Sequence, residues 1–288
     1  MKKKIHIIGA GPIGLILGWQ LQKNNCEVSI YEKNDIVGGM CRTWKWKDFL
    51  LDTGPHIFHT PDENLANYWE KEFGDLFIKG DFWCKNVAGK NFDEYWDYPL
   101  SWETISKFPK ELKTKVLDDL KNIDEEKKHS AKNYQEYIEG QVGKTIAKMF
   151  FETYPKKVWG IPTNEMTPDW APKRIEFREK IKPFYDKQWN AVGKYGTGSI
   201  YENIKEKFLA LGGNLFLNHQ LTEIKHTEKK IISISFGNNK NIDFNKEDLL
   251  ISSLPITLTA KFLSFKCDLK FRGIRSIYLA YNKEKIIK

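Results

Sequence analysis

The sequence predicts an α/β protein with a doubly wound parallel sheet, into which a helical, mixed α+β domain is inserted. A short strand-like run at residues 4–8 is followed by a glycine-rich turn, an apolar helical pattern and a second strand-like run. These elements fall within about 30 residues, which is the length of a strand–helix–strand unit. Strand-like runs return at 214–217 and 249–255, after a long stretch with helical periodicity. The inserted domain would therefore lie between two halves of the sheet.

Composition narrows the class of protein. The 288 residues contain 46 Lys and Arg against 38 Asp and Glu, a formal net charge of +8, and 14% are aromatic. So many aromatic residues can bury a core, which excludes a disordered chain, and the length allows roughly two domains. The four cysteines are scattered and include no CxxC pair, which excludes a disulfide scaffold and a cysteine-ligated metal site. Such cysteine usage is typical of a protein in the reducing cytoplasm. Lysines alternate with acidic residues, which favours a solvated surface over nucleic-acid binding. No apolar run approaches the roughly 20 residues that cross a bilayer.

The first strand ends at a Gly-x-Gly-x-x-Gly motif, which contains Gly9, Gly11, Pro12 and Gly14. The first glycine permits a tight turn, the second lets the backbone approach a pyrophosphate, and the third lets the helix pack closely on the strand. Free N–H groups at the helix N-terminus favour the negative phosphates. Glu32 ends the second strand, where it would accept hydrogen bonds from a ribose diol and disfavour a 2′-phosphate. These residues predict a site for NAD or FAD, and a glycine-rich turn that binds nothing is the alternative.

A second glycine pair follows the acidic residue and carries a resemblance. The segment after Glu32 resembles the extended flavin-binding signature of the amine oxidase and protoporphyrinogen oxidase-like superfamily. The resemblance implies FAD rather than NAD, with the glycine pair running along its pyrophosphate and ribityl part. Arg42 would be the phosphate partner, and a surface arginine is the alternative. The cofactor-binding residues implied in this segment are Lys33, Gly38, Gly39, Arg42 and Thr43.

Residues 54–60 read Gly-Pro-His-Ile-Phe-His-Thr and resemble UDP-galactopyranose mutase, a flavoenzyme family that interconverts two ring forms of UDP-galactose. The resemblance places this loop beside the isoalloxazine ring of FAD, with Gly54, Pro55 and His56 as cofactor contacts. It assigns catalytic roles to His56 and His59, because imidazoles titrate near neutral pH and can tune a flavin. Two loop histidines that cap backbone groups are the alternative.

The middle of the chain is mostly helical in pattern. Apolar residues recur at three-to-four spacing over 62–73, 105–120, 131–139 and 141–153. A turn or short strand is predicted at 97–100.

A Tyr-x-x-x-x-Trp-Gly block followed by Lys-Arg-Ile again resembles the mutase family. This implies that Tyr154 and Trp159 contact a uridine and that Arg174 pairs with the substrate diphosphate. Packing in a core is the alternative role for the tryptophans. The Trp-Ala-Pro-Lys-Arg-Ile segment also resembles less characterised protoporphyrinogen oxidase-like flavoproteins.

The last third returns to the nucleotide-binding domain. A helix is predicted at 200–211, with strands at 214–217, 221–224, 231–236, 241–244 and 249–255. A hairpin turn is expected at Gly-Asn-Asn, residues 237–239. By the same resemblance, the backbone near Thr222 and Glu223 approaches the adenine. Arg275 matches a second arginine that binds the substrate diphosphate.

Four segments follow from these patterns: a first part of the FAD-binding domain at 1–61, the substrate domain at 62–193, a second FAD-binding part at 194–256, and the start of a substrate-domain sheet at 257–288. Members of the family continue beyond this point, so the resemblance implies an incomplete sheet. A truncated gene, a complementing chain that supplies the rest and a minimal variant are the alternatives, and a missing strand would favour association with a second copy of the chain.

The expected function is that of an FAD-dependent oxidoreductase-like flavoprotein whose flavin N5 carries the chemistry on a nucleotide sugar or other small molecule. Two alternatives remain open. One is a mutase-type isomerase that uses reduced FAD on a UDP-sugar, and the other is an inactive or partner-dependent FAD-binding fragment. Neither the substrate nor the electron acceptor follows from the residues. No metal, nucleic-acid partner or transmembrane segment is expected.

Overall fold

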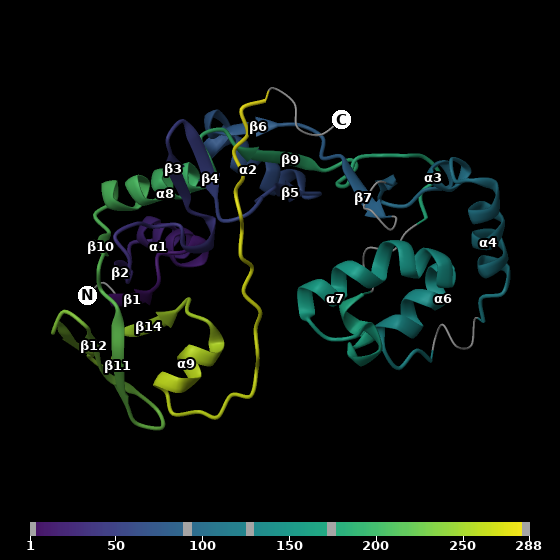
Figure 1. Cartoon of the computed structure of the whole chain (residues 1–288). Coiled ribbons are helices and arrows are strands. Elements are labelled where there is room, and N and C mark those ends of the chain that lie inside the picture. The colour runs from purple at the N-terminus through teal and green to yellow at the C-terminus, as the bar shows by residue number, and fades with distance from the viewer. Residues whose placement is uncertain (1–3, 89–93, 125–129, 172–176, 284–288) are drawn as a thin grey trace. The chain divides into compact units, whose positions relative to one another are not determined.

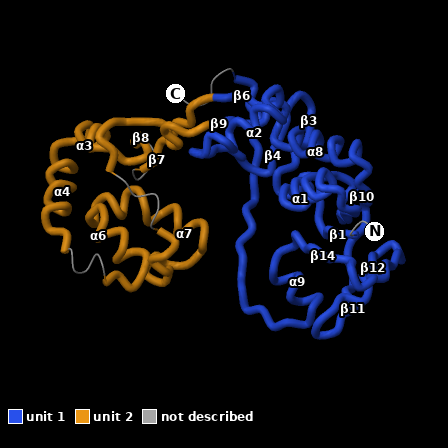
Figure 2. Tube along the Cα trace, turned by 180° about the vertical axis from the view of Figure 1, so that it is seen from behind, with its two compact units in different colours: residues 1–79, 191–288 blue, residues 80–190 orange. Residues whose placement is uncertain are grey.

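The computed structural model describes residues 4–88, 94–124, 130–171 and 177–283. The chain divides into two compact units (Figure 2). Unit 1 comprises residues 1–79 and 191–288, and unit 2 comprises residues 80–190. Unit 1 is thus built from both ends of the chain, with unit 2 inserted between them.

A parallel four-stranded sheet forms the centre of unit 1 (Figure 1). Its strand order is β10–β2–β1–β14, and each neighbouring pair is parallel. The strands are β1 (Lys4–Ile8), β2 (Glu27–Tyr31), β10 (Asn214–Phe216) and β14 (Leu249–Ser252). Because β1 and β2 come from the start of the chain and β10 and β14 from its last third, the sheet confirms the predicted α/β class.

Helices and a small antiparallel sheet cover the two faces of the parallel sheet. The helix α1 (Pro12–Lys23) packs on β1 and β2, and α8 (Gly198–Ala210) packs on α1. The other face carries an apolar cluster that joins Ile8 and Tyr31 to the antiparallel strands. The antiparallel strands are β11 (Leu221–His226), β12 (Ile231–Phe236) and β13 (Asn241–Asp243), and the helix α9 (Ile256–Phe262) packs against the same cluster. The turn predicted at 237–239 joins β12 to β13.

The helix α8 is amphipathic and buries one stripe. Ile200, Ile204 and Phe208 recur every four residues, and all three are fully buried. Burial of each such side chain stabilises the fold by about 1.5–3 kcal/mol. The face of α8 that packs on α1 is therefore set by the residue spacing.

Unit 1 contains two further small sheets. One is a hairpin of β3 (Thr43–Trp46) and β4 (Phe49–Asp52), and the other has the order β5–β9–β6. The strands of the latter are β5 (Phe58–Thr60), β9 (Trp189–Gly193) and β6 (Phe77–Lys79). The helix α2 (Glu63–Phe73) lies beside them, because the ring of Trp69 packs 5.5 Å from that of Phe58 on β5 and 5.9 Å from that of Phe77 on β6.

An ion pair joins α2 to α8. Lys207 Nζ lies 2.8 Å from Glu72 Oε2, and Lys23 of α1 lies 4.0 Å from the same carboxylate. The hydrogen bond from Lys207 lowers the pKa of Glu72, and the charges of Lys207 and Lys23 act in the same direction. A carboxylate whose pKa is lowered by folding stabilises the protein above its unfolded pKa and loses this contribution as the pH falls.

We therefore expect Glu72→Gln to lower the free energy of unfolding at neutral pH by about 0.5–1 kcal/mol. The difference between variant and wild type should shrink as the pH falls below the ordinary pKa of a glutamate carboxyl, because the folding-lowered pKa of Glu72 is then approached. Urea unfolding of both proteins between acidic and neutral pH would measure it. A difference that is constant with pH would contradict the ionic origin of the effect.

Unit 2 combines a β-hairpin with helices around its own apolar core. Its fully buried side chains include Val116, Ile138 and Ile146. The elements are β7 (Cys84–Ala88), β8 (Glu94–Tyr98), α3 (Trp102–Ser106), α4 (Lys110–Lys121), α6 (Tyr134–Ile146), a π-helical turn (Ala147–Glu152) and α7 (Thr153–Trp159). The single helix predicted over 105–120 was wrong, because Pro109 separates α3 from α4. Proline has no N–H and disfavours helical geometry in the residue before it.

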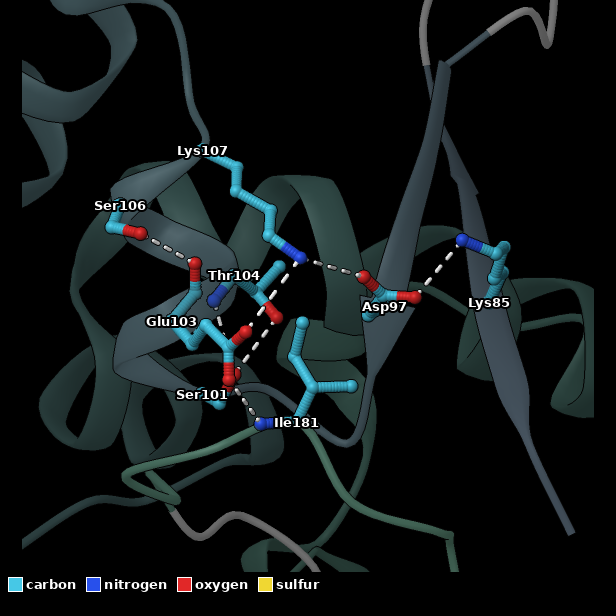
Figure 3. A network of polar contacts seen from close by, with 8 residues as sticks. All are labelled: Lys85, Asp97, Ser101, Glu103, Thr104, Ser106, Lys107 and Ile181. Carbon is cyan, nitrogen blue, oxygen red and sulfur yellow. Dashed lines mark hydrogen bonds and ion pairs between the residues drawn. The ribbon is translucent and has the colours of Figure 1, made fainter.

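A polar network fastens the hairpin of unit 2 to α3 (Figure 3). Asp97 on β8 lies 2.9 Å from Lys85 Nζ on β7 and 3.8 Å from Lys107 Nζ beyond α3. Glu103 accepts a hydrogen bond of 3.1 Å from the backbone N–H of Ile181. Ser101 caps α3 by accepting from Thr104 N–H. The network therefore joins three segments that are distant in sequence.

After α9 the chain continues as an extended segment, residues 264–283, drawn in yellow in Figure 1. This segment belongs to unit 1 but forms no strand in the described part of the chain. Its apolar side chains are largely exposed, for example Phe271 and Ile274.

Within the described ranges, no helix is long and apolar enough to cross a membrane. Over the same ranges, no three His, Cys, Asp or Glu side chains are grouped in a way that could hold a metal ion.

Candidate nucleotide-binding site

The glycine motif forms a turn in which neither Gly9 nor Gly14 leaves room for a larger side chain. A Cβ at Gly14 would lie 1.9 Å from the carbonyl oxygen of Gly9, so the first turn of α1 presses directly on the end of β1. Gly9 has a φ of +99°, a conformation that favours glycine. A Cβ there would also lie 2.4 Å from Ser253 Oγ, which follows β14. The turn is thus built from both halves of unit 1.

The second glycine pair packs against this turn. The N–H of Gly38 donates a 2.8 Å hydrogen bond to the carbonyl of Ala10. A Cβ at Gly39 would lie 3.0 Å from the Cα of Gly11. Both residues of the pair have positive φ, +95° and +54°. Two backbone loops therefore meet without intervening side chains beside the N-terminus of α1.

The carboxylate of Glu32 is buried and fastens the glycine turn. Its Oε2 accepts from the N–H of Ala10 at 2.9 Å, and its Oε1 accepts from the backbone and side-chain nitrogens of Asn34. An ionised carboxylate has about four acceptor positions, so these three bonds leave one. A contact with a ribose hydroxyl stays a prediction, and the structure adds a positioning role that the sequence did not indicate.

The helix N-terminus and Arg42 supply unused donors. Gly11 is the N-cap of α1 and, having no side chain, cannot accept hydrogen bonds from the N–H groups of the first turn. The next residue is Pro12, which has no N–H of its own. Arg42 follows the second glycine pair, with its guanidinium 4.8 Å from the ring centroid of Trp44. Its Nε is buried and has no hydrogen-bond partner in the described structure. A buried, unpaired charged donor beside a helix N-terminus suits an anionic phosphate group.

A groove lies next to the predicted flavin-facing loop. Its volume is about 640 Å³, and Leu50, Asp52, Gly54, Pro55, Gly193, Lys194, Gly196, Ser276, Ile277 and Tyr278 line it. The N–H of Gly54 donates to Tyr278 Oη at 3.2 Å, so the extended segment 264–283 closes one side. His56 Nδ1 is buried without a hydrogen-bond partner among the described residues, whereas His59 on β5 is exposed.

The other predicted cofactor residues are placed less directly. Lys33 is exposed beside Glu32. Thr222 and Glu223 lie on β11, where their side chains contact Ser235 of β12 at 3.0 and 3.5 Å. Their link to the site runs through the backbone, because the N–H of His219 donates to the carbonyl of Glu32. An approach of this backbone to an adenine stays a prediction.

The predicted substrate residues fall in different parts of the molecule. Tyr154 and Trp159 lie on α7 of unit 2, where Tyr154 is 67% exposed. Trp159 packs edge-on against Trp170 with 5.7 Å between ring centroids. Arg275 is exposed on the segment 264–283 of unit 1. Arg174 lies outside the described residues. The structure therefore tests none of these four as a joint site.

Sequence reasoning missed a set of residues that hold the site together. Asp52 and Thr197 form hydrogen bonds with each other across 145 positions, and Tyr201 lies beside Cys41. Burial raises the pKa values of both the Cys41 thiol and the Tyr201 hydroxyl. The Asp-x-Gly-Pro-His pattern already contains Asp52, but its partners are too distant in sequence to be inferred.

Comparison with known proteins agrees with this geometry. Residues 7–71 match the model of the NAD(P)-binding Rossmann-like domain. The probable UDP-galactopyranose mutase of Klebsiella pneumoniae is 27% identical over 214 residues, covering 71% of this chain and 53% of that protein. The dTDP-fucopyranose mutase of Escherichia coli is 24% identical over 70% of this chain and 53% of its own length. The 1-hydroxycarotenoid 3,4-desaturase of a Flavobacterium strain is 33% identical, over 35% of this chain and 20% of its own length.

Among solved structures, a reduced UDP-galactopyranose mutase superposes with a TM-score of 0.72. The sequences are 22% identical, and the match covers 91% of this chain and 56% of that one. This likeness shows the shared fold. The chain spans about half the length of the mutases that it matches.

Fold and site thus define a protein with a Rossmann-like nucleotide-binding domain. More particularly, its sequence is similar to sugar-nucleotide mutases over about 70% of the chain and to a carotenoid desaturase over 35%.

Proposed function

We propose that this chain is the FAD-binding part of a flavoenzyme that acts on a nucleotide sugar. The observation that carries the proposal is the pair of glycine loops packed beside the N-terminus of α1, with the unpaired Nε of Arg42 next to them. The second glycine loop extends the backbone surface around the phosphates. A dinucleotide too long to be bound by the first loop alone would therefore contact both loops. The residues present fit FAD in this respect.

Two groups of residues of this chain would contact two different ends of the cofactor. Gly9, Gly11 and the helix N-terminus would bind the pyrophosphate, and Arg42 would neutralise it. Gly54, Pro55 and His56 would border the ring, where the buried His56 Nδ1 could take a hydrogen bond. When bound, FAD supplies the reactive N5 position of its ring, while the protein orients and tunes it.

A nucleotide-sugar substrate is favoured by how far the matches extend. A match over seven-tenths of a 288-residue chain necessarily includes most of unit 2, at residues 80–190. The two proteins matched over that length are both mutases of nucleotide sugars, UDP- and dTDP-linked. The desaturase match covers only 35% of the chain. The greater extent of the mutase matches favours a redox-neutral mutase reaction over net oxidation, which is the function expected from the sequence alone.

An absorbance spectrum of the purified chain, with and without added FAD, is the first test. Visible flavin bands that stay with the protein through gel filtration would support the proposal. UDP-galactose and dTDP-fucose would then be titrated against the oxidised and the reduced flavoprotein. Binding that strengthens on reduction, without consumption of an electron acceptor, would support a mutase, whereas stoichiometric acceptor reduction would support an oxidoreductase. A colourless chain that takes up no FAD would contradict both the mutase and the oxidoreductase function. The remaining alternative would be a fragment that depends on a partner.

We expect Arg42→Met to weaken FAD binding roughly 10- to 150-fold, the loss of about 1.5–3 kcal/mol for a hydrogen bond to a charged group. Methionine keeps much of the side-chain length without the charge. Quenching of FAD fluorescence on titration with each protein would measure the dissociation constants. Lys45→Met, on the exposed hairpin nearby, is the matched control and should change affinity by less than about threefold. Equal losses in the two variants would show that net charge, rather than Arg42, holds the cofactor.

A further inference from the structure

One carboxylate lies at the junction of the two loops that face the proposed cofactor. Asp52 is the last residue of β4 and stands two positions before Gly54. Its Oδ2 accepts a 2.6 Å hydrogen bond from Thr197 Oγ1, and both its oxygens lie within 3.2 Å of Thr197 N–H. Thr197 is almost completely buried and is the N-cap of α8. The negative charge therefore meets the positive end of the α8 dipole.

Thr43 completes the junction from the other strand of the hairpin. It faces Asp52 in the antiparallel register, and its hydroxyl donates to the Asp52 carboxylate. The same hydroxyl accepts from the N–H of Gly198 at 2.8 Å. A Cβ at Gly196 would lie 2.4 Å from Thr43 Cγ2, so the backbone just before α8 rests directly on this threonine. Because each polar atom has a specific partner, the junction has one preferred geometry.

The junction connects both cofactor-facing segments. Arg42 precedes Thr43 directly, and its carbonyl accepts from the hydroxyl of Thr53 at 3.4 Å. Gly54 follows Thr53, and its N–H also donates to the carbonyl of Asp52 at 2.7 Å. A displacement of Asp52 would therefore move Arg42, at the phosphate end, and the Gly54–His56 loop, at the ring end. The glycine turn at residues 9–14 makes its hydrogen bonds elsewhere, to Glu32 and Gly38.

We propose that Asp52, acting through Thr43 and Thr197, is a positioning residue that sets the distance between the phosphate-binding and ring-binding parts of the site. This inference rests on the proposed function, since it assumes that FAD spans the two loops. Asp52 itself contacts neither part of the cofactor in this account. Its removal should leave the glycine turn intact and misplace the two segments relative to each other.

The deciding experiment compares Thr43→Val with Thr43→Ser. Valine keeps the shape but removes the hydroxyl, whereas serine keeps the hydroxyl and loses only a methyl group. We expect Thr43→Val to weaken FAD binding by roughly tenfold or more and to alter the visible circular dichroism of the bound flavin. Thr43→Ser should restore both. Binding of adenosine, which has no phosphate for Arg42 to contact, should stay within about threefold of wild type in both variants.

Asp52→Asn provides a second variant at the carboxylate itself. It keeps an acceptor oxygen for Thr197 N–H but loses the charge, so its FAD affinity should fall between those of wild type and Thr43→Val. Asp97→Asn removes an ion-paired carboxylate of unit 2 and is the control, because it should change the affinity for neither ligand. Far-ultraviolet circular dichroism of each variant would confirm that it is folded.

Three results would overturn the inference. Unchanged FAD affinity and an unchanged flavin spectrum in Thr43→Val would show that the junction does not position the cofactor. Equal losses of FAD and adenosine binding would show a general structural role. Failure of the wild type to bind FAD would overturn the proposed function and this inference with it, whereas the first two results leave FAD binding by the wild type in place.

Discussion

Replacing Gly14 by alanine is expected to abolish FAD binding and to destabilise unit 1 by at least about 1–3 kcal/mol. The added Cβ would stand 1.9 Å from the carbonyl oxygen of Gly9, and neither atom can rotate away, because the oxygen is part of the backbone and the backbone fixes the position of the Cβ. The helix α1 must then move away from β1, which opens the turn that would hold the pyrophosphate. Thermal unfolding and FAD titration of the same preparation would measure both effects.

Gly80→Ala is the matched control for this substitution. A Cβ at Gly80 meets no atom within 4 Å in the described structure, so stability and FAD affinity should stay close to wild type. If Gly14→Ala retained FAD with wild-type affinity, the close approach of α1 to β1 would not be needed for binding, and the proposed cofactor site would be wrong.

Phe208→Ala should lower the free energy of unfolding of unit 1 by about 3–5 kcal/mol. The ring is fully buried on α8 and packs directly on the backbone of Gly213, where an added Cβ would come within 2.2 Å of it. The loss combines the transfer of a large apolar group with the cavity that remains. Urea unfolding followed by circular dichroism would give the difference in free energy.

The neighbouring Leu209 supplies the control on the same helix. It is 43% exposed, and Leu209→Ala should change stability by no more than about 0.5–1 kcal/mol. Similar losses in the two variants would show that α8 does not pack on α1 as described. Because Phe208 lies far along α8 from Thr197, a destabilised but folded variant should still show the flavin spectrum of wild type.

The strand–glycine turn–helix unit could be predicted because its causes are local. Gly9 acts through its own positive φ, Gly14 packs on the carbonyl of Gly9 five positions away, and short strand-like runs define β1 and β2. The hairpin of β12 and β13 was predictable for the same reason. The break between α3 and α4 also has a local cause, in Pro109, although periodicity alone favoured one helix.

Other features follow from contacts that no local pattern contains. The bonds of Asp52 to Thr197, and of Thr43 to Gly198, join residues about 150 positions apart. Glu32 was predicted as a ribose ligand from its spacing, yet most of its acceptor capacity is used by Ala10 and Asn34. The unpaired Nε of Arg42 is likewise visible only after folding buries it.

The sequence by itself thus determined the α/β class, the position of the nucleotide turn and the discontinuous order of the two halves, since these depend on local conformation and on apolar periodicity. The tertiary structure alone decided which polar groups are satisfied within the protein and which remain available to a ligand. That distinction depends on burial and on partners brought together by chain folding, and a buried donor left unpaired has a meaning only when its whole surroundings are known.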